Sequence, residues 1–154
     1  MKNAMRQRLK GDEGFTLIEL MVVVMIISVL IAIAIPSFLG FRGSAQDRSA
    51  QSEVRNVLLA EKAHWLDNAE YTETLTDITA FEPNANVHAS DEGEGVVPIL
   101  ATSDQIVCLH RTSDSGSIFG IWESATAGTF YGEPTAAPTS CAATTPTGYV
   151  AGGW

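Results

Sequence analysis

Basic residues are scarce in most of this 154-residue chain, and their shortage limits what its surface can bind. The sequence contains nine Lys and Arg residues against eighteen Asp and Glu residues, and four of the nine basic residues lie before residue 11. From Phe15 onward, five basic residues face sixteen acidic ones. Binding to a nucleic-acid backbone requires clustered Lys and Arg side chains. We therefore expect no nucleic-acid partner, and no binding of anionic lipid through charge.

Residues typical of catalytic and metal sites are also few. The sequence has three histidines, His64, His88 and His110, and they lack the spacing of a metal-binding set. His110 lies near Ser113 and Asp114, but neither a nucleophile elbow nor an oxyanion-hole motif accompanies them. The acidic run 91–95 lacks EF-hand spacing, so we interpret it as a solvated loop. We therefore expect no enzymatic activity, no cofactor and no metal site.

Only two cysteines are present, Cys108 and Cys141, and neither belongs to a C-x-x-C motif. Two interpretations are open. In an exported protein, an even pair far apart in a small chain indicates one disulfide bond. In a cytosolic protein, the same pair would be two free, buried thiols. The choice depends on whether the chain is exported.

One long apolar run, residues 15–39, addresses that question. It holds 25 residues with a single charge, Glu19. As a helix it would be about 37 Å long, which is enough to cross a bilayer. Its apolar residues lie all round the helix, unlike those of an amphipathic surface helix. Because four basic residues precede the run, we expect the N-terminus to stay cytoplasmic and the remainder to lie outside, where Cys108 and Cys141 would form a disulfide.

Three interpretations of this run compete. A secretory signal peptide would be cut after Ala34, in a small-x-small site, but the run is longer than usual and contains a charge. An unprocessed membrane anchor leaves Glu19 unexplained, since an unpaired carboxylate in a membrane is costly. In the third interpretation, the anchor is cut so that a new amino terminus lies near Glu19.

The sequence GFTLIEL at residues 14–20 favours the third interpretation. It resembles the signal of type IV pilins and the related pseudopilins, in which a prepilin peptidase cuts after the glycine and methylates the new first residue. The resemblance implies a leader peptide over residues 1–14, cleavage between Gly14 and Phe15, and N-methylation of Phe15.

The resemblance also assigns assembly roles to Glu19 and Pro36. A glutamate at the place of Glu19 is a hallmark of the family, and a proline at the place of Pro36 is common in it. After cleavage, the amine of Phe15 in the same or a neighbouring subunit can pair with Glu19, and a paired carboxylate is much cheaper to bury than a lone one. Pro36 lacks an N–H group, so we expect a kink or a weak point in the helix there.

The helical pattern continues from residue 37 to about residue 68. One stripe at helical spacing should face a sheet; it contains Ala50, Val54, Val57, Leu58 and Trp65. A second strip of Leu59, Ala63 and Leu66 lies off this stripe, and it is either a contact surface for neighbouring subunits or thinly covered surface. Glu61 lies within the main stripe, and we expect it at the edge of the stripe or paired.

Strand-like runs follow the helix. They lie at 96–101, which Pro98 restricts to an edge, at 106–110 and 117–122, which form a hairpin, and at 128–131. We expect residues 71–83 to be a connecting loop with at most a short turn, and the tail 133–154 to be tied back through Cys141. The predicted fold is α+β, with a long N-terminal helix packed on a small antiparallel sheet, as in pilins. The predicted divisions after the leader are a filament-core helix, 15–39, and the remaining helix and head, 40–154.

The resemblance implies a structural subunit, a major or minor pilin, of a type IV pilus that serves adhesion, motility or DNA uptake. The alternative is a pseudopilin of a type II secretion or competence system, and a third, less favoured, is a protein released by signal peptidase. The implied partners are other copies in a helical filament, prepilin peptidase, the assembly platform and its motor, and membrane lipid before assembly. The implied location is a single-pass membrane precursor and then an extracellular pilus.

Overall fold

The structure is a computed structural model that describes residues 14–90 and 95–154. Residues 1–13 of the predicted leader and most of the acidic run, 91–94, lie outside the described residues. The chain divides after Gly40 into an N-terminal unit and a second unit, Phe41–Trp154, which we call the head.

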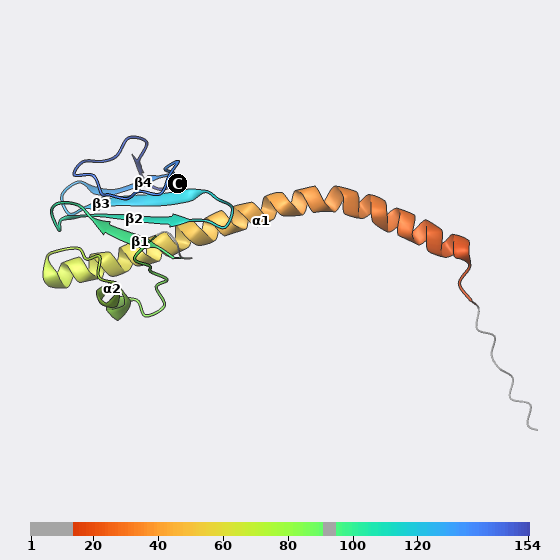
Figure 1. Cartoon of the computed structure of the whole chain (residues 1–154), viewed down its shortest axis with the longest axis horizontal. Coiled ribbons are helices and arrows are strands. Elements are labelled where there is room, and N and C mark those ends of the chain that lie inside the picture. Colours follow the sequence, from red (N-terminus) through yellow and green to blue (C-terminus); the bar gives the residue numbers. More distant parts are fainter. Residues whose placement is uncertain (1–13, 91–94) are drawn as a thin grey trace, which may run out of the picture. The chain divides into compact units, whose positions relative to one another are not determined.

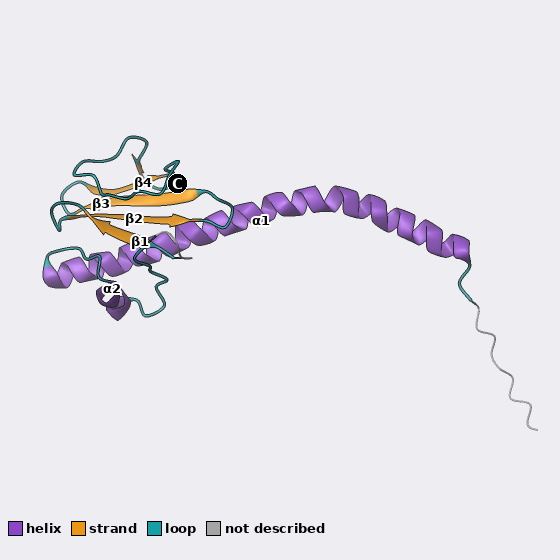
Figure 2. Cartoon of the chain, viewed as in Figure 1, coloured by secondary structure: helices purple, strands orange, loops and turns teal. Residues whose placement is uncertain are grey.

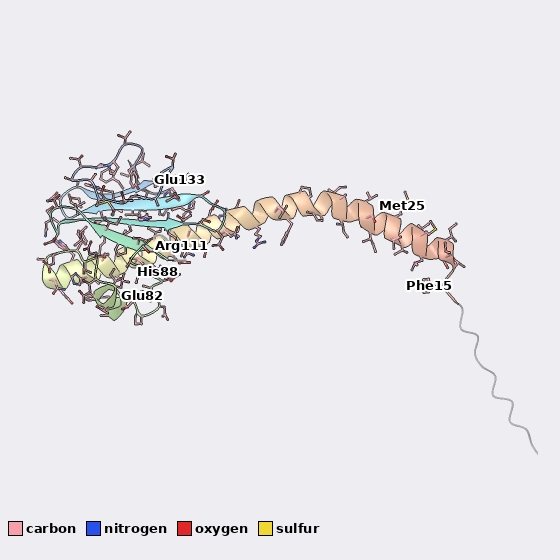
Figure 3. All side chains as sticks on the ribbon, in the orientation of Figure 1. Phe15, Met25, Glu82, His88, Arg111 and Glu133 are labelled. Atoms are coloured by element: carbon pink, nitrogen blue, oxygen red, sulfur yellow. A yellow bond between two sulfur atoms is a disulfide. The ribbon has the colours of Figure 1, made fainter. Side chains whose placement is uncertain are left out.

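The long helix α1 spans Leu17–Asn68 (Figures 1 and 2). In the N-terminal unit its side chains project on all sides and are exposed, as the sticks between Phe15 and Met25 show (Figure 3). By length and composition this helix can cross a membrane. The helix continues through Pro36 without a break, so the predicted weak point at this proline remains a prediction.

The head combines the second half of α1 with one antiparallel sheet (Figure 2), which confirms the α+β prediction. The strands lie in the order β1-β2-β3-β4-β5, with bounds Val97–Leu100, Ile106–Thr112, Ile118–Ser124, Gly128–Gly132 and Val150–Ala151. The predicted hairpin is the β2–β3 pair, in which Thr112 lies opposite Ile118. The predicted edge strand is β1, which contains Pro98 and pairs within the sheet only with β2.

One local expectation was wrong, and one short strand was not anticipated. The connection after α1 is more ordered than predicted, because it contains the helix α2, Leu75–Phe81. Its side chain Ile78 is fully buried in the head core, and this burial holds a segment whose own sequence signal is weak. The tail also contributes a two-residue strand, β5, which pairs with β4 and which no alternation of apolar residues announced.

The first layer of the core lies between α1 and the sheet. Val54 and Val57 of the predicted stripe are buried against Val107, Leu109 and Ile121. Ala50 and Leu58 are buried as well, while Trp65 is partly buried against the same cluster. The prediction that this stripe faces the sheet is confirmed.

A second apolar layer covers the opposite face of the sheet, which we call the outer face. Because side chains alternate along β2 and β3, Cys108 and Trp122 point away from α1 and pack with residues of the tail. The Trp122 Nε1 atom donates a hydrogen bond to the carbonyl of Ala142, 2.9 Å away. Tyr149 lies over the paired glycines Gly120 and Gly132, where a Cβ atom on Gly132 would overlap its ring and one on Gly120 would overlap its hydroxyl group.

Cys108 and Cys141 are joined by a disulfide bond, with their Cα atoms 5.4 Å apart. This confirms the disulfide prediction. The bond attaches the tail to β2, one of the three central strands of the sheet. The outer face therefore depends on a segment that contributes only two residues of regular strand.

Replacing both Cys108 and Cys141 with Ser should destabilise the head. The bond joins residues 33 positions apart, and closing a loop of this size corresponds to about 4 kcal/mol through loss of unfolded-state entropy. Denaturant unfolding of the detergent-solubilised chain, followed through Trp fluorescence, measures this loss. A Ser140→Ala variant beside the bond should unfold like the wild type, and equal midpoints for wild type and the double variant would contradict the prediction.

Candidate assembly and processing site

The N-terminus of α1 is closed by a reciprocal pair of side chains. The Glu19 Oε2 atom accepts hydrogen bonds from the backbone N–H of Thr16 at 2.9 Å and from the Thr16 hydroxyl at 2.6 Å. In return, the Thr16 hydroxyl oxygen accepts the backbone N–H of Glu19 at 3.3 Å. This is a capping box, which satisfies donors that the first turn of a helix leaves free. Sequence reasoning missed it, although the T-x-x-E pattern at residues 16–19 was visible.

The predicted cleavage point lies just before this cap. Gly14 and Phe15 are exposed and precede the helix, with Phe15 at its start in Figure 3. A peptide bond outside a helix is open to a protease, since no helical hydrogen bonds need to be broken. Cleavage after Gly14 and methylation of Phe15 remain predictions. The capping box would hold the Glu19 carboxylate within one helical turn of the new amine.

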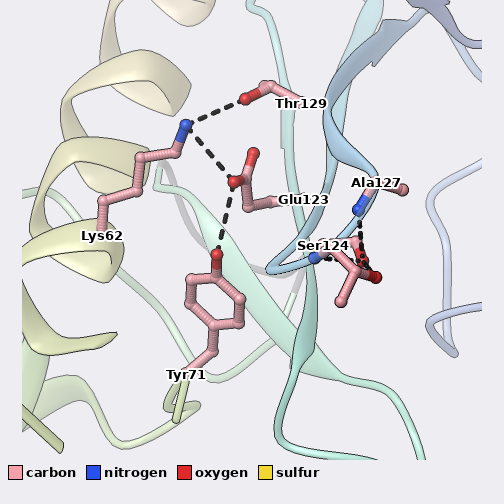
Figure 4. Close-up of polar contacts among 7 residues, drawn as sticks. Lys62, Tyr71, Glu123, Ser124, Ala127 and Thr129 are labelled. Atoms are coloured by element: carbon pink, nitrogen blue, oxygen red, sulfur yellow. Dashed lines mark hydrogen bonds and ion pairs between the residues drawn. The ribbon is translucent and has the colours of Figure 1, made fainter. Parts of the chain in front are cut away.

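A polar cluster fastens the head around the end of α1 (Figure 4). The Glu123 Oε1 atom of β3 lies 3.3 Å from the Lys62 Nζ atom of α1 and accepts a hydrogen bond from the Tyr71 hydroxyl, also at 3.3 Å. Lys62 donates a further hydrogen bond to the Thr129 hydroxyl of β4 at 2.9 Å. Burial and the nearby Glu123 carboxylate raise the pKa of Tyr71, which keeps its hydroxyl a donor. The cluster joins α1, the connection and two strands.

Glu61 differs from its predicted place at the edge of the apolar stripe. It is fully buried, because its position on α1 turns it into the head core. No cation partner neutralises it among the described residues; instead its Oε2 atom accepts the backbone N–H of Thr72 at 3.1 Å, and its Oε1 atom has no hydrogen-bond partner there. Burial raises the pKa of Glu61 to about 7, against a smaller lowering by the Thr72 hydrogen bond.

The second strip on α1 resolves into exposed surface in the head. Leu59 and Leu66 are largely exposed, and Ala63 between them is half-buried. The residues on the opposite side of α1, such as Val54 and Val57, form the core described above. The strip is therefore not part of the interior of a single chain.

Comparisons with known proteins place these features in a family. Residues 9–35 match the prokaryotic N-terminal methylation motif. The chain is 34% identical over 107 residues to a fimbrial protein of Pseudomonas aeruginosa, a match that covers 61% of this chain and 70% of that relative. This chain belongs to the type IV pilin family. The pilin-family sequence and the apolar helix α1 are those of a precursor anchored in the membrane.

Other relatives of this pilin-family chain fall into two groups. The type IV major pilin protein PilA of Myxococcus xanthus is 38% identical over 72 residues, which is 47% of this chain and 32% of that relative. The type II secretion system core protein G of Klebsiella pneumoniae is 32% identical over 89 residues, which is 56% of this chain and 64% of that relative. The match thus spans about a third of the Myxococcus protein.

The buried Glu61 should make head stability fall as pH rises. In the unfolded chain its carboxyl loses its proton near the ordinary pKa of 4.5, whereas in the folded head it does so near 7. Between these values the folded state binds more protons, so the Glu61 contribution is complete below pH 4.5 and is lost by about pH 7. The loss amounts to roughly 3 kcal/mol.

Glu61→Gln should remove this dependence, which denaturant unfolding at several pH values between 4.5 and 8 would measure. The exposed Glu73→Gln variant makes the same chemical change outside the core and serves as the control. If the wild type and the Glu61→Gln variant lost the same stability over this window, Glu61 would not be the group that controls it.

Proposed function

We propose that this chain is a structural subunit of a type IV pilus. The observation that carries the proposal is the apolar first half of α1, exposed on every side, whose first turn lies within the GFTLIEL motif. No described residue of the chain covers this surface, so it needs lipid before assembly and other copies afterwards. Similarity to a fimbrial protein over most of that relative's length supports the same function.

The proposed pathway begins with the precursor held in the membrane by α1, with the leader on the cytoplasmic side. Prepilin peptidase cuts between Gly14 and Phe15 and methylates the amine of Phe15. The subunit then leaves the lipid for the filament, through the assembly platform and its motor. In the filament core water is absent, so the Glu19 carboxylate and a Phe15 amine must satisfy each other.

The capping box gives Glu19 two roles in this pathway. In the precursor its carboxylate accepts the Thr16 donors and closes the helix. Since a carboxylate has two oxygens and about four acceptor directions, it can keep the cap and still accept an ammonium group from a neighbour. We infer that the cap orients Glu19 for the incoming subunit rather than competing with it.

A pseudopilin of a type II secretion or competence system is the second candidate, which the similarity to core protein G supports. The disulfide bond between the tail and β2 favours the pilus interpretation. A filament outside the cell must keep its fold there, and the two strand residues of the tail would hold it only weakly without this bond. Electron microscopy of sheared surface fractions tests the choice. Loss of long surface filaments on deletion of this gene supports a pilus, whereas loss of protein secretion with no change in filaments supports the alternative.

Gly14→Val should leave an uncut precursor in the membrane. A peptidase site shaped around glycine has no room for a branched side chain, and Gly14 itself is exposed with open space around it, so the substitution does not disturb the helix. Intact mass of the purified protein would report whether it begins at Met1 or at Phe15. Gly40→Val, at another glycine with open space, is the control and should be processed normally; normal maturation of Gly14→Val would contradict the proposed cleavage.

Substitutions at Glu19 and Thr16 should separate charge pairing from helix capping. Glu19→Gln keeps an oxygen that can cap the helix but removes the charge, and Glu19→Leu removes both. Because breaking a buried charge pair costs about 3–5 kcal/mol, we expect both variants to insert in the membrane yet form few filaments. Thr16→Val removes the hydroxyl of the cap and keeps the charge, so it should still form filaments.

Electron microscopy of sheared fractions, with membrane immunoblots as the control for insertion, measures the result. Normal filaments from Glu19→Gln together with few from Thr16→Val would assign Glu19 to capping alone.

A further inference from the structure

The head begins with a segment of α1 whose exposed charges are all positive. We call this segment, residues 41–52, the collar. Arg42 and Arg48 are exposed there, and neither side chain forms an ion pair or a hydrogen bond with another described residue. The only acidic residue of the collar, Asp47, is half-buried and accepts a hydrogen bond from the Ser115 hydroxyl. The carboxylate of the collar is therefore held against the head, while its two arginines face outward.

The other Lys and Arg residues of the head are engaged internally. Arg111 and Lys62 each form an ion pair with a glutamate of the head. The Arg55 guanidinium lies over two aromatic rings, at 4.9 and 5.7 Å from their centres. Within the described part of the head, the free guanidinium and ammonium groups are thus confined to the collar, although the chain after residue 14 is strongly acidic.

The collar comes directly after the apolar run that can cross a membrane. Arg42 and Arg48 follow Leu39, the last residue of that run, by three and nine positions on the same helix. At 1.5 Å per residue this corresponds to about 5 and 14 Å, and the headgroup layer on each side of a bilayer is about 5–7 Å thick. Because long side chains on a helix lean toward its N-terminus, both arginines point back toward the headgroup layer.

We propose that Arg42 and Arg48 bind the phosphate groups of phospholipid headgroups on the outer side of the membrane, while α1 anchors the unassembled chain there. A guanidinium group presents paired N–H donors that match two oxygens of one phosphate. The neighbouring Phe41 is 75% exposed, and a membrane interface accommodates an aromatic ring beside a charged group. The inference rests on the membrane stage of the proposed function and holds equally for a pilin or a pseudopilin.

The collar positions the chain in the membrane and does not recruit it. The apolar run supplies the affinity for lipid, and the acidic head is repelled by an anionic surface, as its charge balance predicts. Two arginines on one short segment are enough to fix the height at which α1 leaves the hydrocarbon, since moving either guanidinium away from the headgroups breaks its hydrogen bonds. The contact also holds the carboxylates of the head away from the lipid phosphates.

Solid-state NMR of the full chain in vesicles of phosphatidylethanolamine and phosphatidylglycerol tests the contact directly. The guanidinium carbon of arginine is labelled with ¹³C, and its signal is dephased only where a lipid ³¹P nucleus lies within a few ångströms. Arg6→Lys and Arg8→Lys remove the two leader arginines from this signal and keep their charge. Four arginines then remain, two of them in the collar, so about half of the signal should be dephased.

Lysine substitutions on this background assign the dephased signal. Adding Arg42→Lys and Arg48→Lys should abolish nearly all dephasing, because the two arginines that remain are engaged inside the head. Adding Arg55→Lys instead is the matched control, and the dephased share should then rise to about two thirds, with two of three arginines in the collar. Dephasing that is absent from the background chain, or unchanged by the collar substitutions, would overturn the proposal.

Two further samples separate the lipid contact from other causes. In dodecyl maltoside micelles, which contain no phosphorus, added inorganic phosphate should give no dephasing; dephasing equal to that in vesicles would overturn the assignment to lipid headgroups. Alkaline extraction of the vesicles reports whether the chain is inserted. An inserted chain without dephasing would overturn the collar contact alone, whereas a chain that is washed from the vesicles would contradict the membrane stage of the proposed function as well.

Discussion

The structure depends on a change in the surroundings of α1 along its length. In its first half, apolar side chains cover the whole circumference, which only lipid or other helices can accommodate. In its second half, one side is buried by the sheet and the opposite side stays exposed. Each property of the chain follows from this division: the first half requires a membrane and then neighbours, and the second half supplies a folded head with a surface left over.

The head is small, and its sheet has to be covered on two faces. The helix covers one face through Val54, Val57 and Leu58. On the outer face, the tail of Thr, Ala, Pro and Gly has little apolar surface to bury. Two specific contacts hold it there instead: the Cys108–Cys141 disulfide bond and the ring of Tyr149 over the paired glycines. A segment with a weak pattern is thus held by a few strong, local contacts.

The features that could be predicted from the sequence are those with a strong period or motif. The buried stripe of α1, the β2–β3 hairpin and the edge position of β1 follow from apolar spacing, turn residues and Pro98. The helix α2 and the strand β5 could not be predicted, because seven and two residues are too few to show a clear period, and the residues that hold them, such as the core around Ile78 and the strand β4, are distant in sequence. The complete burial of Glu61 was also missed, because helical spacing predicts the side of the helix on which a residue lies but not how many residues cover it. Of the candidate site, the motif predicted the residues, while the Thr16–Glu19 cap was overlooked.

The internal pairing of charges in the head explains why few residues can direct assembly. Lys62 forms an ion pair with Glu123, and Arg111 forms one with Glu53. Arg55 makes cation–π contacts with the rings of Trp154 and Tyr131. Among the described residues of the head, the exposed charges that are left outside these pairs are mostly carboxylates, so two heads repel one another in most orientations. Orientations that bring Arg42 or Arg48, both exposed on α1, onto a carboxylate of another head escape this repulsion. The scarcity of basic residues after residue 14 therefore restricts how two heads can meet, because most orientations place like charges against each other.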